Sequence, residues 1–173
     1  VMKLPSTWQS AGHHHSGMFW FRRTVEIPAE WAGRELTLHL GAVDKQDIAY
    51  VNGIEVGRTG KDREDQHWNL PRHYPISAPA VTGRTLVIAV RVYSFVYDGG
   101  IIGAEKDLRI SVAGAPETSL PLAGGWRYRI EHDLGTVNED HVMGHGERNS
   151  PHILFDNMIR PLIPYAMRGA IWY

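Results

Sequence analysis

The segment that decides the fold class is IAYVNGIEVG, residues 48–57. Two strand-like runs, IAYV and IEVG, flank the pair Asn52-Gly53. Asn-Gly is the pair best suited to the positive φ angles of a type I′ turn, and such a turn joins two antiparallel strands. The segment therefore predicts a β-hairpin.

Further strands are predicted on both sides of this hairpin. Residues 35–40 alternate strictly, with Leu36, Leu38 and Leu40 on one face and Thr37 and His39 on the other. Repeated short strands without intervening helices are typical of an antiparallel β-sandwich or jelly roll. We therefore predict a mainly β chain, with the other strands at residues 19–27, 85–96, 108–112 and 120–130.

The last residues differ from this pattern. In residues 149–173, Asn149 and Ser150 can cap a helix, Pro151 suits its first turn, and apolar residues follow at helical spacing before a short apolar strand. A helix that leads into an apolar strand is typical of an α/β domain. We expect a β-sandwich at residues 1–129, a linker at 130–148 and a truncated α/β segment at 149–173. The chain is then a piece of a larger protein.

The apolar side chains of residues 149–173 are too many for a solvated terminus, because burying one is worth about 1.5–3 kcal/mol. We expect this segment either to dock on the sandwich or to form a homodimer with a second copy.

Composition excludes several classes of partner. The formal net charge is −1, with 18 basic and 19 acidic residues interspersed, so we expect neither nucleic acid nor an anionic membrane as a partner. No apolar run is long enough for a membrane span. The chain has no cysteine, which excludes disulfides and thiolate metal sites.

No catalytic or metal site can be assigned from motifs. The run His13-His14-His15 suggests a metal, but consecutive strand residues point to opposite faces, and we expect an exposed loop instead. Neither a G-x-S-x-G motif nor an N-terminal G-D-S block is present. We expect no catalytic residue, metal or cofactor in this chain.

Aromatic residues provide the candidate binding site. The loop at residues 58–79 and the turn at residues 93–103 are expected to meet at one end of the sandwich. Flat amphipathic rings can stack on a pyranose while their polar tips stay hydrated. The candidate substrate-binding residues are Trp68, Tyr74, Tyr93 and Tyr97, although each ring could equally belong to the core.

Two family resemblances appear in these segments. WFRRTVEIP at 20–28, VNGIEVG at 51–57 and GRTLVIAVRV at 83–92 resemble the sugar-binding jelly roll of glycoside hydrolase family 2, a galactose-binding-like fold. LGAVDKQDIAYVNG at 40–53, RHYPI at 72–76, DGGIIG at 98–103 and LAGGWRY at 122–128 resemble the β-domain inserted in bacterial sialate O-acetylesterases. Residues 155–173 resemble the helix and strand with which that family's catalytic domain resumes.

The esterase resemblance implies an SGNH-hydrolase parent, periplasmic or secreted in a bacterium, that removes O-acetyl groups from sialic acid. Its serine nucleophile and Asp/His pair cannot be placed in this sequence, so we expect the chain alone to be inactive. Its partners would be O-acetylated sialic acid or a related glycan and the remaining catalytic domain. Two alternatives stay open: a carbohydrate-binding jelly roll of a family 2 type glycoside hydrolase, and a purely structural insert.

Overall fold

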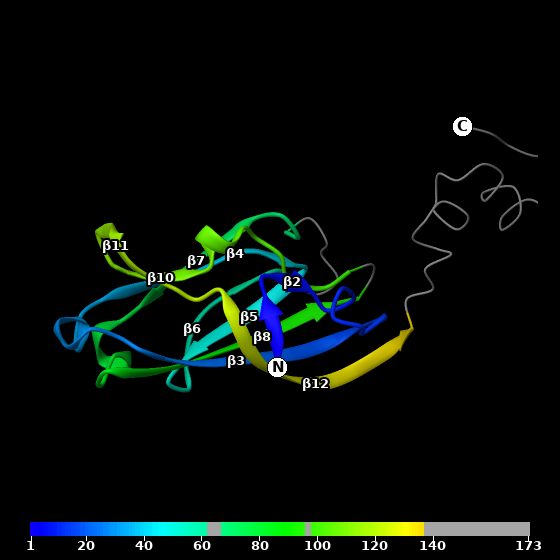
Figure 1. Cartoon of the computed structure of the whole chain (residues 1–173), viewed down its shortest axis with the longest axis horizontal. Coiled ribbons are helices and arrows are strands. Elements are labelled where there is room, and N and C mark those ends of the chain that lie inside the picture. Colours follow the sequence, from blue (N-terminus) through cyan, green and yellow to red (C-terminus); the bar gives the residue numbers. More distant parts are fainter. Residues whose placement is uncertain (62–66, 96–97, 137–173) are drawn as a thin grey trace, which may run out of the picture. The chain divides into compact units, whose positions relative to one another are not determined.

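The computed structural model describes residues 1–61, 67–95 and 98–136, which form an antiparallel β-sandwich (Figure 1). This confirms the predicted mainly β fold. Three short 3-10 helices accompany the strands, at Ala29–Trp31, Ala78–Ala80 and Glu105–Asp107. The strands are β1 (Met2–Leu4), β2 (Ser6–Thr7), β3 (His15–Glu26), β4 (Leu36–Asp44), β5 (Gln46–Val51), β6 (Ile54–Thr59), β7 (Pro71–Ile76), β8 (Thr85–Ser94), β9 (Gly100–Ile101), β10 (Arg109–Val112), β11 (Ala115–Pro121) and β12 (Gly124–Thr136).

The strands form two sheets. Sheet one has the order β1-β12-β3-β8-β5-β6. Sheet two has the order β11-β10-β4-β9-β2, and β7 pairs with β4. In Figure 1, β3 and β12 lie along the lower side of the sandwich, while β4, β7, β10 and β11 lie along the upper side. Apolar side chains from both sheets meet between these layers.

The core follows the alternation in the strands. On β8, every second residue from Leu86 to Val92 is buried, and the neighbouring strands present matching residues. Trp8 stacks on Phe19 with ring centroids 4.2 Å apart. Fully or almost fully buried residues from both sheets include Phe19, Phe21, Leu36, Leu38, Leu40, Ala49, Val51, Leu86, Ile88, Val90, Val92, Ile110 and Trp126.

The predicted hairpin is present as β5 and β6. Asn52 and Gly53 have φ angles of 50° and 82°, as the turn requires. Asn52 also binds two other segments: its amide donates to the Ala80 carbonyl (2.9 Å) and its side-chain oxygen accepts from the Val87 N–H (2.9 Å). The turn is therefore held against the start of β8.

The expected long loop at residues 58–79 contains a strand, β7, which the sequence did not reveal. Its burial alternates, with Arg72, Tyr74 and Ile76 inward. Two inward positions carry polar side chains, so the apolar alternation is hidden. Pro71 and Pro75 are tolerated because β7 pairs only with β4 in the described structure.

The boundary expected at Arg129 falls inside β12, which continues to Thr136. Its later part pairs with β3, for example Ile130 with Phe19 and His132 with Met18. The rest of the expected linker and the α/β segment at residues 149–173 lie outside the described residues. In the described part, no helix is long and apolar enough to cross a membrane.

Candidate functional site

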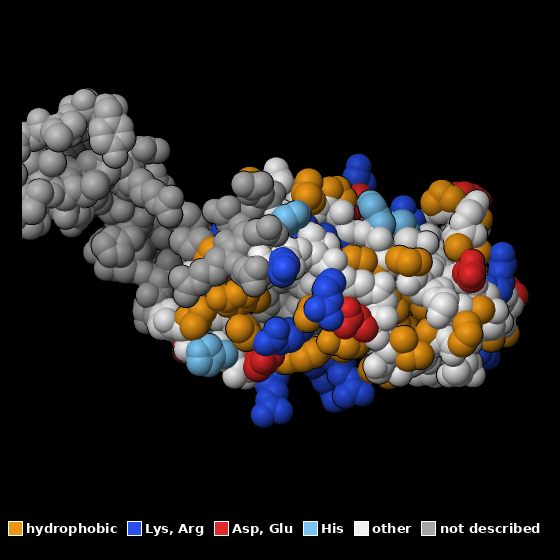
Figure 2. All heavy atoms as spheres, turned by 180° about the vertical axis from the view of Figure 1, so that it is seen from behind, with side chains coloured by type: hydrophobic (Ala, Val, Ile, Leu, Met, Phe, Trp, Pro, Cys, Tyr) orange, Lys and Arg blue, Asp and Glu red, His pale blue; other side chains and the backbone are white. Residues whose placement is uncertain are grey.

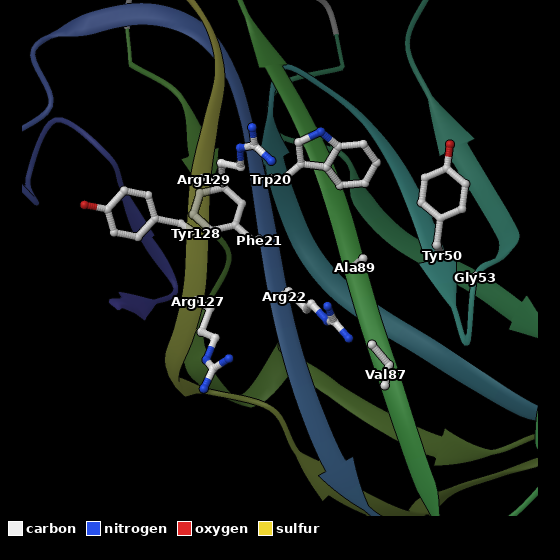
Figure 3. A pocket seen from close by; sticks show the side chains of 10 residues that line it. All are labelled: Trp20, Phe21, Arg22, Tyr50, Gly53, Val87, Ala89, Arg127, Tyr128 and Arg129. Carbon is white, nitrogen blue, oxygen red and sulfur yellow. The ribbon is translucent and has the colours of Figure 1, made fainter.

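An apolar hollow lies on the outer face of sheet one, the face whose side chains point away from the core. This groove has a volume of about 560 Å³. Its apolar floor consists of Trp20, Tyr50, Val87 and Ala89. Figure 3 shows the Trp20 ring reaching across β8 toward Tyr50, while Tyr128 points away from them. The two rings have centroids 5.8 Å apart and are tilted by 36°.

Strand alternation places these side chains on the surface. Phe19 and Phe21 are completely buried, so Trp20 and Arg22, which follow them on β3, face outward. Tyr50 lies between buried Ala49 and Val51 in the same way. The groove is therefore a direct consequence of packing the opposite face.

Arginines line one side of the groove. Arg22 on β3 is directly opposite Arg127 on β12, and Arg129 is opposite Trp20. Figure 3 shows Arg22 extending from β3 toward β8. Like charges directly opposite one another destabilise a sheet. In the described part of the chain, no ion pair or side-chain hydrogen bond neutralises Arg22, Arg127 or Arg129.

A fourth arginine on this face is neutralised. Arg91 binds both Glu131 oxygens, at 2.6 and 2.7 Å. The Trp20 indole N–H donates to the same carboxylate at 2.7 Å, which fixes the orientation of the ring. The hydrogen bond from Arg91 holds the pKa of Glu131 below its usual value, and in turn raises the pKa of Arg91.

Two further hollows adjoin basic side chains of sheet one. One of about 360 Å³ is lined by Arg58, Lys61, Arg91 and Tyr93 among others. The other, of about 560 Å³, shares Arg22 and Arg127 with the groove. Figure 2 shows basic side chains standing out from the bottom of the described part, with hydrophobic ones near them.

A different arginine is buried between the sheets. Arg72 is 1% exposed and donates from Nε to Asp47 Oδ1 at 2.8 Å. Its other nitrogens donate to four backbone carbonyls: those of Val43 and Lys45, each at 2.8 Å, and those of His67 and Leu70.

Tyr74 completes this buried network. Its hydroxyl donates to Asp47 Oδ2 at 2.7 Å and lies 2.7 Å from Thr59 Oγ1. Burial raises the pKa of Asp47, and the hydrogen bonds from Arg72 and Tyr74 oppose that shift. Burial and the Asp47 carboxylate also raise the pKa of Tyr74. The network joins β5, β6 and β7 and has a structural role.

Three hydrogen-bonding side chains on sheet two, Ser111, His39 and His73, form a row that resembles a catalytic triad, but its serine is buried. His39 Nε2 lies 2.8 Å from Ser111 Oγ, and His39 Nδ1 lies 2.7 Å from His73 Nδ1. Ser111 is 1% exposed, so its hydroxyl cannot reach a substrate. Burial, with Arg109 and His73 nearby, lowers the pKa of His39 to about 4.

The four aromatic residues proposed from the sequence occupy different places. Tyr74 is 7% exposed and belongs to the core network, so it has no ring face for stacking. Trp68 is 48% exposed, and Tyr93 lies against Phe95 on the outer face, with ring centroids 5.6 Å apart. Tyr97 lies outside the described residues. The buried Tyr74 cannot stack on a sugar, and a role for Trp68, Tyr93 and Tyr97 in sugar binding stays a prediction.

The histidine run also separates in space. His13 Nε2 lies 2.8 Å from the Tyr128 hydroxyl, and His15 Nδ1 lies 3.3 Å from Asp133 Oδ1. Among the described residues, no three His, Asp or Glu side chains are placed to hold a metal ion.

The sequence did not single out Trp20, Tyr50 or the three arginines. A signal for Trp20 and Tyr50 was available: each is out of phase with its buried neighbours, which places a large ring on the solvent side. The proximity of Arg22 and Arg127 requires the pairing of β3 with β12, which no local pattern specifies.

Comparisons with known proteins assign no family to this chain. No protein-family model matches the sequence, and a search of curated proteins finds no match. Solved structures of the β-glucuronidase from Ruminococcus gnavus are similar at 23% identity over 56% of this chain, with a TM-score of 0.47. A complex of that enzyme with N1-substituted uronic isofagomine gives a TM-score of 0.48 at the same identity and coverage.

The similarity is limited in extent. The matched part covers 16% and 17% of those two β-glucuronidase chains, about a sixth of their length. Nothing in the comparisons supports the resemblance to sialate O-acetylesterases. At this level of similarity, any function has to be argued from the described surface itself.

Proposed function

We propose that the β-sandwich is a non-catalytic carbohydrate-binding domain of a carbohydrate-active enzyme. It contacts the glycan through the groove on the outer face of sheet one. The observation that supports this is the pair of neighbouring rings, Trp20 and Tyr50, in an apolar groove with Val87 and Ala89.

The chemistry of the groove suits a sugar ring. A pyranose has apolar C–H faces and polar edges, so it needs a flat aromatic surface with hydrogen-bonding groups beside it. Trp20 is held in place by Glu131, which reduces the entropy lost when a ligand stacks on it. Arg22 and Arg129 supply donors at the rim, where sugar hydroxyls would lie.

The domain can provide binding without chemistry. Ser111 and His39 are buried, and the Asp47–Arg72 pair is fully used inside the sandwich. His73 is exposed, but the serine of its row cannot reach a substrate. Neither group supplies an accessible nucleophile. Binding and positioning of a glycan is the role that the accessible residues can perform.

The finer assignment of the parent enzyme rests on sequence motifs alone. The motifs at residues 40–53 and 122–128 resemble sialate O-acetylesterases, whose reaction is removal of O-acetyl groups from sialic acid. The full-length parent should then release acetate from O-acetylated sialic acid. Hydrolysis of a p-nitrophenyl glycoside without acetate release would instead support the glycoside hydrolase alternative.

NMR titration of the chain with a panel of neutral and acidic oligosaccharides tests the binding proposal. The indole signal of Trp20 and the backbone amide signals of Trp20 and Tyr50 should shift. Trp20→Ala should abolish the shift at Tyr50. Trp68→Ala is the matched control, because Trp68 is an exposed tryptophan outside the groove. Loss of binding in Trp68→Ala but not in Trp20→Ala would move the site to the loop, and no shifts with any sugar would refute the proposal.

A further inference from the structure

We propose that the outer face of sheet one binds an acidic polysaccharide, with Arg22 and Arg127 holding one anionic group and Arg129 the next. This inference rests on the proposed function and specifies its ligand class. It depends on the charges beside the groove rather than on its aromatic floor.

The first argument is the arrangement of Arg22 and Arg127. They are directly opposite one another on adjacent strands, and the described structure places no acceptor on either. Like charges at opposite positions destabilise a sheet, and an anion in the hollow of about 560 Å³ that both arginines line would reduce their repulsion. A carboxylate or sulfate can accept two parallel N–H bonds from one arginine, which neutral hydroxyls cannot match.

The second argument is the repeated spacing of charge. Arg127 and Arg129 are two residues apart on one strand, so they share a face and are separated by about 6.8 Å along it. Glu131, the next residue on that face, is already bound by Arg91 and Trp20. A ligand with a single anion would engage one site and leave the other arginine unsatisfied, whereas a polymer with a charge on each repeat engages both.

The third argument is continuity. A second hollow, of about 560 Å³, shares Arg22 and Arg127 with the groove. Arg23 also lines it, but its guanidinium already donates to the Leu122 and Ala123 carbonyls. The two unpaired arginines therefore border both hollows, so a ligand bound at them can continue from one hollow into the other.

A nucleic acid is the competing polyanion, and the charge balance disfavours it. Basic residues number 18 and acidic residues 19 in the whole chain. Nucleic-acid binding draws on a wide positive field, which a chain of net charge −1 does not provide. A local group of arginines beside an apolar floor suits a ligand with spaced charges and apolar ring faces.

The test compares binding to polygalacturonate, to the same polymer after reduction of its carboxyl groups, and to single-stranded DNA, by isothermal titration calorimetry. We expect binding to polygalacturonate that weakens steeply as salt is raised, because exposed charge pairs are screened. The variant Arg22→Gln/Arg127→Gln should lose at least about tenfold in affinity. The control Arg34→Gln/Lys106→Gln removes the same charge from exposed positions outside the three hollows and should lose less than about twofold.

The outcomes separate this inference from the proposed function. Equal binding to the reduced, neutral polymer would overturn the inference and leave carbohydrate binding intact. Tighter binding to DNA would overturn it in favour of a nucleic acid. If no polymer binds and Trp20 does not respond to any sugar, both proposals fail. The melting temperature of each variant shows that a loss of affinity does not come from unfolding.

Discussion

Arginine has opposite roles in two regions of this molecule. Inside the sandwich, Arg72 is 1% exposed and its guanidinium donates to a carboxylate and to four carbonyls. On the outer face of sheet one, Arg22, Arg127 and Arg129 are exposed, and the described residues supply no acceptor for them. A buried charge requires every donor to be paired, whereas a solvated charge stays available to a ligand.

The contrast separates stability from recognition. Arg72 should be essential to folding and irrelevant to binding, because its partners are all internal. The arginines of the outer face should be dispensable for folding and decisive for binding. Each of the following variants tests one side of that separation.

The largest effect is expected for Arg72→Leu. It leaves the Asp47 carboxylate and several carbonyls buried without their donor, and breaking a buried pair in this way costs about 3–5 kcal/mol. Urea denaturation measures the loss. Arg22→Leu is the matched control and should change the free energy of unfolding by less than about 0.5 kcal/mol. Similar losses in both variants would refute the distinction.

A smaller loss is expected for Gly57→Ala, which disturbs the same network without removing a charge. A Cβ at Gly57 would lie 2.1 Å from Tyr74 Cδ1, so the ring must move away from Asp47. Forced repacking of this kind costs about 1–3 kcal/mol. In Gly83→Ala nothing lies within 4 Å of the new Cβ, so its melting temperature should stay unchanged or rise slightly. A neutral result for Gly57→Ala would mean that β6 can shift freely.

These two regions also show how much could be predicted from the sequence. The Asn52-Gly53 hairpin and the alternation of β4 and β8 are local patterns, and the structure contains all three. β7 was hidden because Arg72 and Tyr74 occupy its inward positions, where an apolar residue would have revealed the strand. The outer-face arginines were missed for another reason: residues 22 and 127 are far apart in the chain and meet only through strand pairing.

A moderate, pH-dependent effect is expected from His39. Its pKa of about 4 in the folded chain lies below the ordinary 6.5, so the unfolded chain binds more protons. The stabilisation is therefore present above about pH 6.5 and is lost as the pH falls toward 4. Arg109 and His73 oppose protonation, and Asp107 favours it. Melting temperatures from pH 7 to 4 should fall less steeply in His39→Gln than in the unsubstituted chain.

The smallest effect on stability, and an informative one for binding, is expected for Glu131→Gln. The pair between Arg91 and Glu131 is partly exposed, so its loss should cost about 0.2–1 kcal/mol. The pKa of Glu131 lies below its usual value, so this contribution is present above about pH 4.5 and disappears as the pH falls further.

The amide oxygen of glutamine can still accept from the Trp20 indole, so the stacking ring should keep its place. Freed from Glu131, Arg91 would join the unpaired arginines of the outer face, and affinity for polygalacturonate should rise about twofold to threefold at low salt. Unchanged or weaker binding in calorimetry, with the melting temperature preserved, would show that the ligand does not approach Arg91 and would confine the anionic contacts to the Arg22, Arg127 and Arg129 side of the groove.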